Sequence, residues 1–83
     1  MPVISTFYGI TIHMFFKDHE PPHFHAEYAG QSELIDIRNG RVLEGKIAKR
    51  AHKMVMEWWE LYRDELTEMW ETNQKNKKLP PLE

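Results

Sequence analysis

An apolar stripe along the second half of this 83-residue chain constrains its fold more than any other feature. At about 100° per residue, the apolar side chains lie on one side of a helix centred on Val55. Neither glycine nor proline interrupts the stripe, which predicts one helix over residues 46–73, with a kink within residues 62–64 as the alternative. The stripe consists of Ile47, Ala51, Met54, Val55, Trp58, Trp59, Leu61, Tyr62, Leu66, Met69 and Trp70.

The first half of the chain has the periodicity of strands. Residues 10–16 alternate in a period of two, with Ile10, Ile12, Met14 and Phe16 on one side. Gly9 and Ala29-Gly30 are typical of turns or bulges between extended segments. The remaining predicted strands cover residues 4–8, 23–28, 33–38 and 41–43.

Asn39-Gly40 is the strongest hairpin signal in the chain. Both central residues of a type I′ turn need positive φ, which asparagine and glycine tolerate. The predicted two-residue turn pairs Ile37 with Val42. It also sets Arg38 opposite Arg41, a like-charge pair that costs stability.

These elements predict an α+β fold with one core. We expect an antiparallel sheet of four or five strands, packed on one side by the long C-terminal amphipathic helix. A chain of this length suits a single domain, here residues 1–75, followed by a non-helical tail over residues 76–83 that contains Pro80-Pro81. Alternation assigns the core face of the sheet to Ile10, Ile12, Met14, Phe16, Phe24, Ala26, Tyr28, Ile35, Ile37 and Val42.

Composition narrows the class of protein. The chain has no cysteine, and therefore no disulfide or thiolate metal site. It has no apolar run of membrane-spanning length and no signal-peptide pattern, so we expect a cytoplasmic protein without membrane contact. No cofactor is expected.

Charge is divided between two segments of the chain. Residues 38–53 carry six basic residues and one acid, whereas residues 57–71 carry six acids and one base. Although the overall charge is only −2, we expect a bipolar domain with one basic and one acidic region. Lys49, Arg50 and Lys53 near the helix start are candidates for phosphate contacts with nucleic acid, although a solvated helix face is the simpler interpretation.

The segment Asp18-His19-Glu20-Pro21-Pro22-His23-Phe24-His25 is the feature most suggestive of chemistry. Its prolines predict a loop that enters a strand, and alternation then turns His23 and His25 away from Phe24. The expected second face of the sheet, wet and half-apolar, collects His13, Phe15, His23, His25, Glu27, Leu34, Asp36 and Leu43.

Three interpretations of this face remain open. His23 and His25 could chelate a metal, but one strand cannot supply a complete site, so a third ligand would come from His13, Asp36 or His19. The same two histidines are the candidate catalytic residues of a metal-independent ribonuclease. The third interpretation, favoured on the residues alone, is structural. Candidate binding residues are His13, His19, His25, Asp36, Arg38, Arg41, Lys49, Arg50 and Lys53.

The chain also resembles a known family over most of its length. The blocks D-H-x-P-P-H-F-H-A from Asp18 and G-x-V-L-E-G-K from Gly40 resemble the small bacterial family called domain of unknown function 4160. The resemblance implies a cytoplasmic module encoded beside a second small protein, and a role in a toxin–antitoxin pair or in transcriptional regulation. It implies no established catalytic residues.

Together these observations favour a non-enzymatic interaction module. Its expected partner is a small protein, with nucleic acid as a possible second ligand. The ribonuclease-type toxin using His23 and His25 and the histidine-based metal protein are the alternatives. A homodimer through the uncovered sheet face or a free strand edge is also possible.

Overall fold

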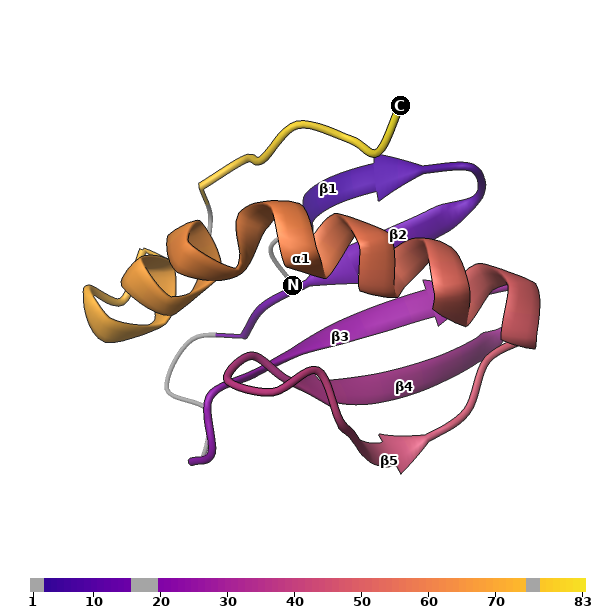
Figure 1. The fold of residues 1–83 in the computed structure, drawn as a ribbon, viewed down its shortest axis with the longest axis horizontal. Helices are drawn as coiled ribbons and strands as arrows, with labels where there is room; N and C mark the ends of the chain where they lie inside the picture. Colours follow the sequence, from indigo (N-terminus) through magenta and orange to yellow (C-terminus); the bar gives the residue numbers. More distant parts are fainter. Residues whose placement is uncertain (1–2, 16–19, 75–76) are drawn as a thin grey trace.

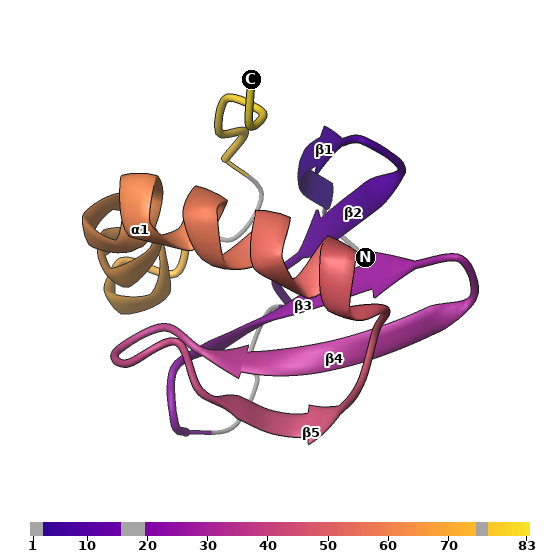
Figure 2. The same ribbon diagram turned by 45° about the vertical axis from the view of Figure 1, so that its right-hand side comes forward.

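Five antiparallel strands and one helix make up the computed structural model, which describes residues 3–15, 20–74 and 77–83. The strands follow one another in the order β1-β2-β3-β4-β5, and the helix crosses one face of the sheet (Figures 1 and 2). This arrangement confirms the predicted α+β class. The elements are β1 Val3–Phe7, β2 Ile10–His13, β3 His23–Tyr28, β4 Gln31–Asp36, β5 Val42–Gly45 and α1 Lys49–Glu71.

Two tight turns connect the first four strands in pairs. Tyr8 and Gly9 have φ of 48° and 79°, and Ala29 and Gly30 have φ of 49° and 80°. Positive φ at both central residues is the signature of a type I′ turn, whose twist matches that of the flanking strands. The turns predicted at Gly9 and Ala29-Gly30 are therefore confirmed.

The predicted two-residue turn at Asn39-Gly40 is wrong. β4 ends at Asp36 and β5 begins at Val42, which pairs with Ile35 rather than with Ile37. Ile37 instead enters the core, and its carbonyl accepts a hydrogen bond from Trp59 Nε1 at 2.7 Å. A longer loop follows, and a bulge in the β4–β5 pairing shifts the register.

The core lies between the sheet and α1, as the two periodicities predict. Trp58 stands at its centre, with its ring 5.8 Å from those of Phe7 and Phe24. Val42 was expected to join the core face, but it is 42% exposed because β5 lies at the edge of the sheet. Phe16 lies outside the described residues. The buried apolar residues are Ile4, Phe7, Ile10, Ile12, Met14, Phe24, Ala26, Ile35, Ile37, Ile47, Ala51, Val55, Trp58, Trp59, Leu66, Met69 and Leu79.

The helix is shorter than predicted and has the alternative kink. It begins at Lys49 rather than residue 46, because Lys46 donates its backbone N–H to Ser32 and remains held against β4. Tyr62 has φ −121° and ψ 17°, which interrupts the helical geometry there. Leu61, at the edge of the predicted stripe, is 61% exposed, so its assignment to the apolar face was wrong.

The C-terminal segment covers one edge of the sheet. Residues 77–83 have no regular secondary structure and lie beside β1 (Figure 1). Leu79 is buried and donates its backbone N–H to the Ile4 carbonyl at 2.7 Å. The Pro80 carbonyl accepts from Trp58 Nε1 at 2.9 Å, which ties the segment to the core as well. Within the described ranges, no helix is long and apolar enough to span a membrane.

Candidate functional site: the histidine face

Three neighbouring strands bring the predicted histidines to one face of the sheet. His13 on β2 pairs with His25 on β3, and His25 pairs with Leu34 on β4. His23 pairs with Asp36 in the same way. Paired residues point to the same side of a sheet, so this group, which we call the histidine face, lies opposite Phe24 and most of α1. His19 lies outside the described residues.

The expectation that these imidazoles are exposed together is wrong. His23 is only 5% exposed, and His13 is also buried, whereas His25 is half-buried. Aromatic side chains lie against them. The Phe15 ring meets His25 edge-on at 4.3 Å, and the Trp70 ring lies 5.1 Å from that of His23.

His23 is held by the loop that precedes β3. Its Nδ1 lies 2.7 Å from the Pro21 carbonyl oxygen. Because a carbonyl can only accept, Nδ1 carries the proton and donates. The contact fixes the tautomer and the orientation of a buried imidazole.

His13 differs from His23 in its polar surroundings. Both of its ring nitrogens are buried and make no hydrogen bond in the part of the chain that the structure describes. The carboxylate oxygen Glu27 Oε1 is 4.0 Å from His13 Nε2, beyond hydrogen-bond distance. Among the described residues, no group of three or more His, Asp or Glu side chains is placed to hold a metal ion.

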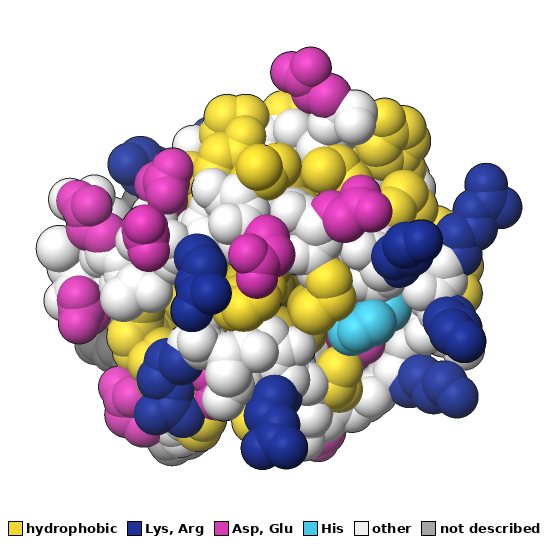
Figure 3. Space-filling model, in the orientation of Figure 1, with side chains coloured by type: hydrophobic (Ala, Val, Ile, Leu, Met, Phe, Trp, Pro, Cys, Tyr) yellow, Lys and Arg dark blue, Asp and Glu magenta, His cyan; other side chains and the backbone are white. Residues whose placement is uncertain are grey.

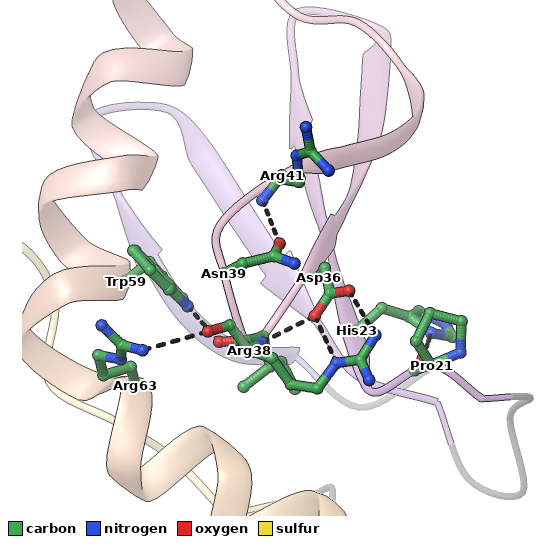
Figure 4. A network of polar contacts seen from close by, with 9 residues as sticks. Pro21, His23, Asp36, Arg38, Asn39, Arg41, Trp59 and Arg63 are labelled. Atoms are coloured by element: carbon green, nitrogen blue, oxygen red, sulfur yellow. Dashed lines mark hydrogen bonds and ion pairs between the residues drawn. The ribbon is translucent and has the colours of Figure 1, made fainter.

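Asp36 and Arg38 form an ion pair beside the histidine face (Figure 4). The Asp36 carboxylate is almost fully buried, and its Oδ2 accepts from Arg38 Nη2 at 2.9 Å. Its Oδ1 accepts from the Arg38 backbone N–H at 2.8 Å and from Nε at 3.2 Å. Arg38 therefore turns toward Asp36 and does not face Arg41 across a hairpin.

The same contact sets the charge of both groups. Hydrogen bonding to the Arg38 side chain lowers the pKa of Asp36 below its usual value, although burial acts in the opposite direction. The same bond raises the pKa of the Arg38 guanidinium. The pair is therefore ionised at neutral pH.

The loop between β4 and β5 is fastened to the helix. Arg63 Nη2 donates to the Arg38 carbonyl at 3.1 Å, and the Arg63 guanidinium lies 4.7 Å from the centre of the Trp59 ring (Figure 4). Gly40 has φ 74°, and a Cβ there would come within about 3 Å of the Trp59 ring. Trp59, which belongs to the predicted helix stripe, is thus buried under this loop.

The basic candidates on the helix are separate from the histidines. Lys49, Arg50 and Lys53 are exposed on the first turns of α1, which covers the opposite face of the sheet. Lys and Arg side chains gather around this end of the helix, whereas Asp and Glu gather near its other end (Figure 3). The predicted bipolar distribution of charge is confirmed in space.

Sequence reasoning missed a polar contact between α1 and the sheet. His52 Nδ1 lies 2.7 Å from Glu33 Oε2, and Glu33 is only 4% exposed. A buried carboxylate needs such a partner, because burial of an unpaired charge costs several kcal/mol. The signal was available, since Glu33 continues the core-facing alternation of Ile35 and Ile37.

The exposed part of the histidine face is hollowed. An open cavity of about 400 Å³ lies over β3, β4 and β5. Leu34 and Leu43 supply its apolar surface, and Leu43 is one of the exposed large apolar side chains. The cavity, which we call the histidine hollow, is lined by Glu20, Pro21, His23, His25, Leu34, Leu43 and Glu44.

Comparison with known proteins identifies the family. The model of a family described as a domain of unknown function, DUF4160, matches residues 9–71, more than half of the chain. This chain belongs to the DUF4160 family. No curated protein and no solved structure matches it.

The DUF4160 match includes every feature of the site described above. Residues 9–71 contain the histidine hollow, the Asp36–Arg38 contact and the His52–Glu33 pair. They exclude β1 and the segment that covers its edge. In this chain the match therefore spans strands β2 to β5 and the helix packed on them.

Proposed function

We propose that this DUF4160 protein is a non-enzymatic interaction module that binds a small partner protein in the cytoplasm, as one member of a toxin–antitoxin-like or regulatory pair. The observation that carries the proposal is the histidine hollow on the sheet face that α1 leaves uncovered. The family resemblance supports the paired role, because it implies a second small protein encoded beside this one.

The composition of the hollow suits a protein ligand. Leu34 and Leu43 offer apolar surface, and Glu20 and Glu44 supply polar groups. The half-buried Phe15 lies against His25, one of the lining residues. Protein interfaces combine an apolar and aromatic centre with a polar rim. The surrounding polar contacts, from His23 to Pro21 and from Asp36 to Arg38, hold the surface in shape.

Co-expression with the product of the adjacent gene tests this proposal. We expect a complex that survives size-exclusion chromatography at micromolar concentration. Leu43→Asp should weaken the complex at least tenfold, because it places a charge on the apolar part of the hollow. Leu61→Asp, the same change at an exposed leucine on the helix, is the matched control and should leave binding unchanged. Absence of any complex at micromolar concentration would contradict the proposal.

Nucleic-acid contact is a second candidate function, supported by the exposed basic residues at the start of α1. Lys49, Arg50 and Lys53 can each reach a phosphate, with the first acidic residue of the helix only at Glu57. We expect weak, salt-dependent binding of a fluorescent RNA or DNA duplex, reduced when the three are changed to glutamine. Equal binding by the triple variant and the parent would contradict it.

A further inference from the structure

One edge of the sheet is covered by another segment of the chain, and the opposite edge is open. The edge at β1 is covered by residues 77–83, whose Leu79 donates to the Ile4 carbonyl. β5 forms the opposite edge, and among the described residues it pairs only with β4. All four residues of β5 are exposed. An open edge of this kind can accept another strand.

The hydrogen-bond pattern identifies the free backbone groups of β5. Asp36 N–H donates to the Arg41 carbonyl, and Lys46 N–H donates to the Ser32 carbonyl. In an antiparallel ladder, such bonds lie on either side of a non-hydrogen-bonded pair. The pairs here are Ile35 with Val42 and Glu33 with Gly45. Val42 and Gly45 therefore direct their own N–H and C=O groups away from β4, toward the open edge.

A second cavity lies beside this edge, on the helix side of β5. It has a volume of about 380 Å³, and Val42 and Ile47 provide its apolar wall. Glu33 also lines it, but its carboxylate is hydrogen-bonded to His52. Side chains of an added strand alternate between the two faces, so one of them would enter this cavity.

Charge indicates which kind of strand fits. Lys46 and Lys49 line the cavity, and Arg41 precedes β5 at its other end. A second copy of this chain is disfavoured, because an antiparallel β5–β5 pair that bonds Val42 to Gly45 would set Arg41 against Lys46. A partner segment with acidic residues on both sides of an apolar centre meets the cations favourably.

We propose that β5 receives an extended segment of the partner protein as a sixth strand, with an apolar anchor in the cavity beside Val42 and acidic residues at both ends. This inference rests on the proposed interaction function and specifies how the partner binds. Backbone hydrogen bonds to Val42 and Gly45 supply affinity, while Lys46 and Lys49 select acidic segments.

Amide chemical-shift mapping with two synthetic peptides tests the proposal. The probe is an acetylated, amidated peptide with alternating Val and Thr between terminal Asp residues, and the control has Lys in place of Asp. We expect the acidic peptide to shift the amides of Val42, Gly45 and Lys49, and to bind at least fivefold more tightly than the basic peptide. Equal affinity, shifts confined to other surfaces, or no shift at about 1 mM peptide, a concentration that detects even weak complexes, would overturn it.

Two variants sharpen the test. Val42→Pro removes the outward N–H without removing a bond to β4, so the fold should persist while peptide binding is lost. Lys46→Glu combined with Lys49→Glu should invert the preference in favour of the basic peptide. Lys53→Glu, one helical turn beyond Lys49 and outside the cavity lining, should change the preference less than twofold.

The co-expressed complex separates this inference from the proposed function. A complex that is lost on Leu43→Asp but unaffected by Val42→Pro would support the interaction module and refute strand addition. Acidic-peptide binding that is lost on Val42→Pro, without any complex with the neighbouring protein, would support strand addition and refute the proposed partner.

Discussion

The buried Asp36 carboxylate offers the sharpest test of how the site is held together. Asp36→Asn keeps the shape of the side chain but replaces Oδ2, which accepts from Arg38 Nη2 at 2.9 Å, with an amide group that cannot accept a hydrogen bond. Hydrogen bonds to charged groups contribute about 1.5–3 kcal/mol. The Arg38 side chain is 61% exposed, so solvent screening should place the loss of unfolding free energy near the lower end.

The same substitution has a defined pH dependence. The Asp36 pKa is lower in the folded protein than the ordinary aspartate value of 3.8. Its contribution is therefore fully present above the unfolded pKa and is lost as the pH falls through the folded pKa. We expect the difference in unfolding free energy between parent and variant to be constant from about pH 8 to pH 5 and to shrink below about pH 4.

Urea unfolding followed by tryptophan fluorescence measures this difference at pH 7 and pH 3. Asp64→Asn, at an exposed carboxylate on α1, is the matched control and should change stability by less than about 0.5 kcal/mol. A loss for Asp36→Asn that is the same at both pH values would refute the reasoning, because the charge of Asp36 would then be irrelevant.

Three further predictions concern stability, each measured by urea unfolding at pH 7. Gly45→Ala should cost more than about 1 kcal/mol, because Gly45 has φ 81° and a Cβ would overlap the Ser32 carbonyl oxygen; an unchanged midpoint would contradict this. His52→Ala should cost about 3–5 kcal/mol by leaving Glu33 buried and unpaired, and adding Glu33→Leu should recover part of the loss. Leu61→Gln should lie within about 0.5 kcal/mol of the parent despite its place in the apolar stripe, and a larger loss would show that Leu61 packs against the core.

Local patterns were sufficient to predict the architecture. Alternation located the buried side of β2 at Ile10 and Ile12, and the helical stripe located Val55 and Leu66. The residue type also located the turn at Gly9, because a tight turn requires positive φ and glycine adopts it without steric cost. These features depend on residues that are neighbours in the sequence, which is why a single sequence reveals them.

The burial of the histidine face depends on residues far apart in the chain. Trp70 approaches His23 from a position 47 residues later, past the kink at Tyr62. The prediction of a two-residue turn at Asn39-Gly40 was wrong for the same reason, since the carbonyl of Ile37 accepts a hydrogen bond from the distant Trp59. Periodicity assigns a residue to a face, but it does not say which side chain from another element will cover it.

The sequence predicted where the site lies, but not the polar contacts within it. The sequence placed His13, His25 and Asp36 on one face, and the structure brings them together there. It did not predict that Arg38 is bound to Asp36. The contact requires a loop longer than the hairpin that Asn39-Gly40 favoured.

The order of the strands has a consequence for how the chain folds. Each strand bonds only to the strand before and after it, so the sheet can assemble by successive hairpins with small loop-closure entropy. The bond from Leu79 to Ile4 spans 75 residues, so we expect it to form after the hairpins. The covering of β1 is therefore the step that converts a sheet with two open edges into one with a single open edge. A brief detachment of residues 77–83 would restore the earlier state without disturbing the other strands.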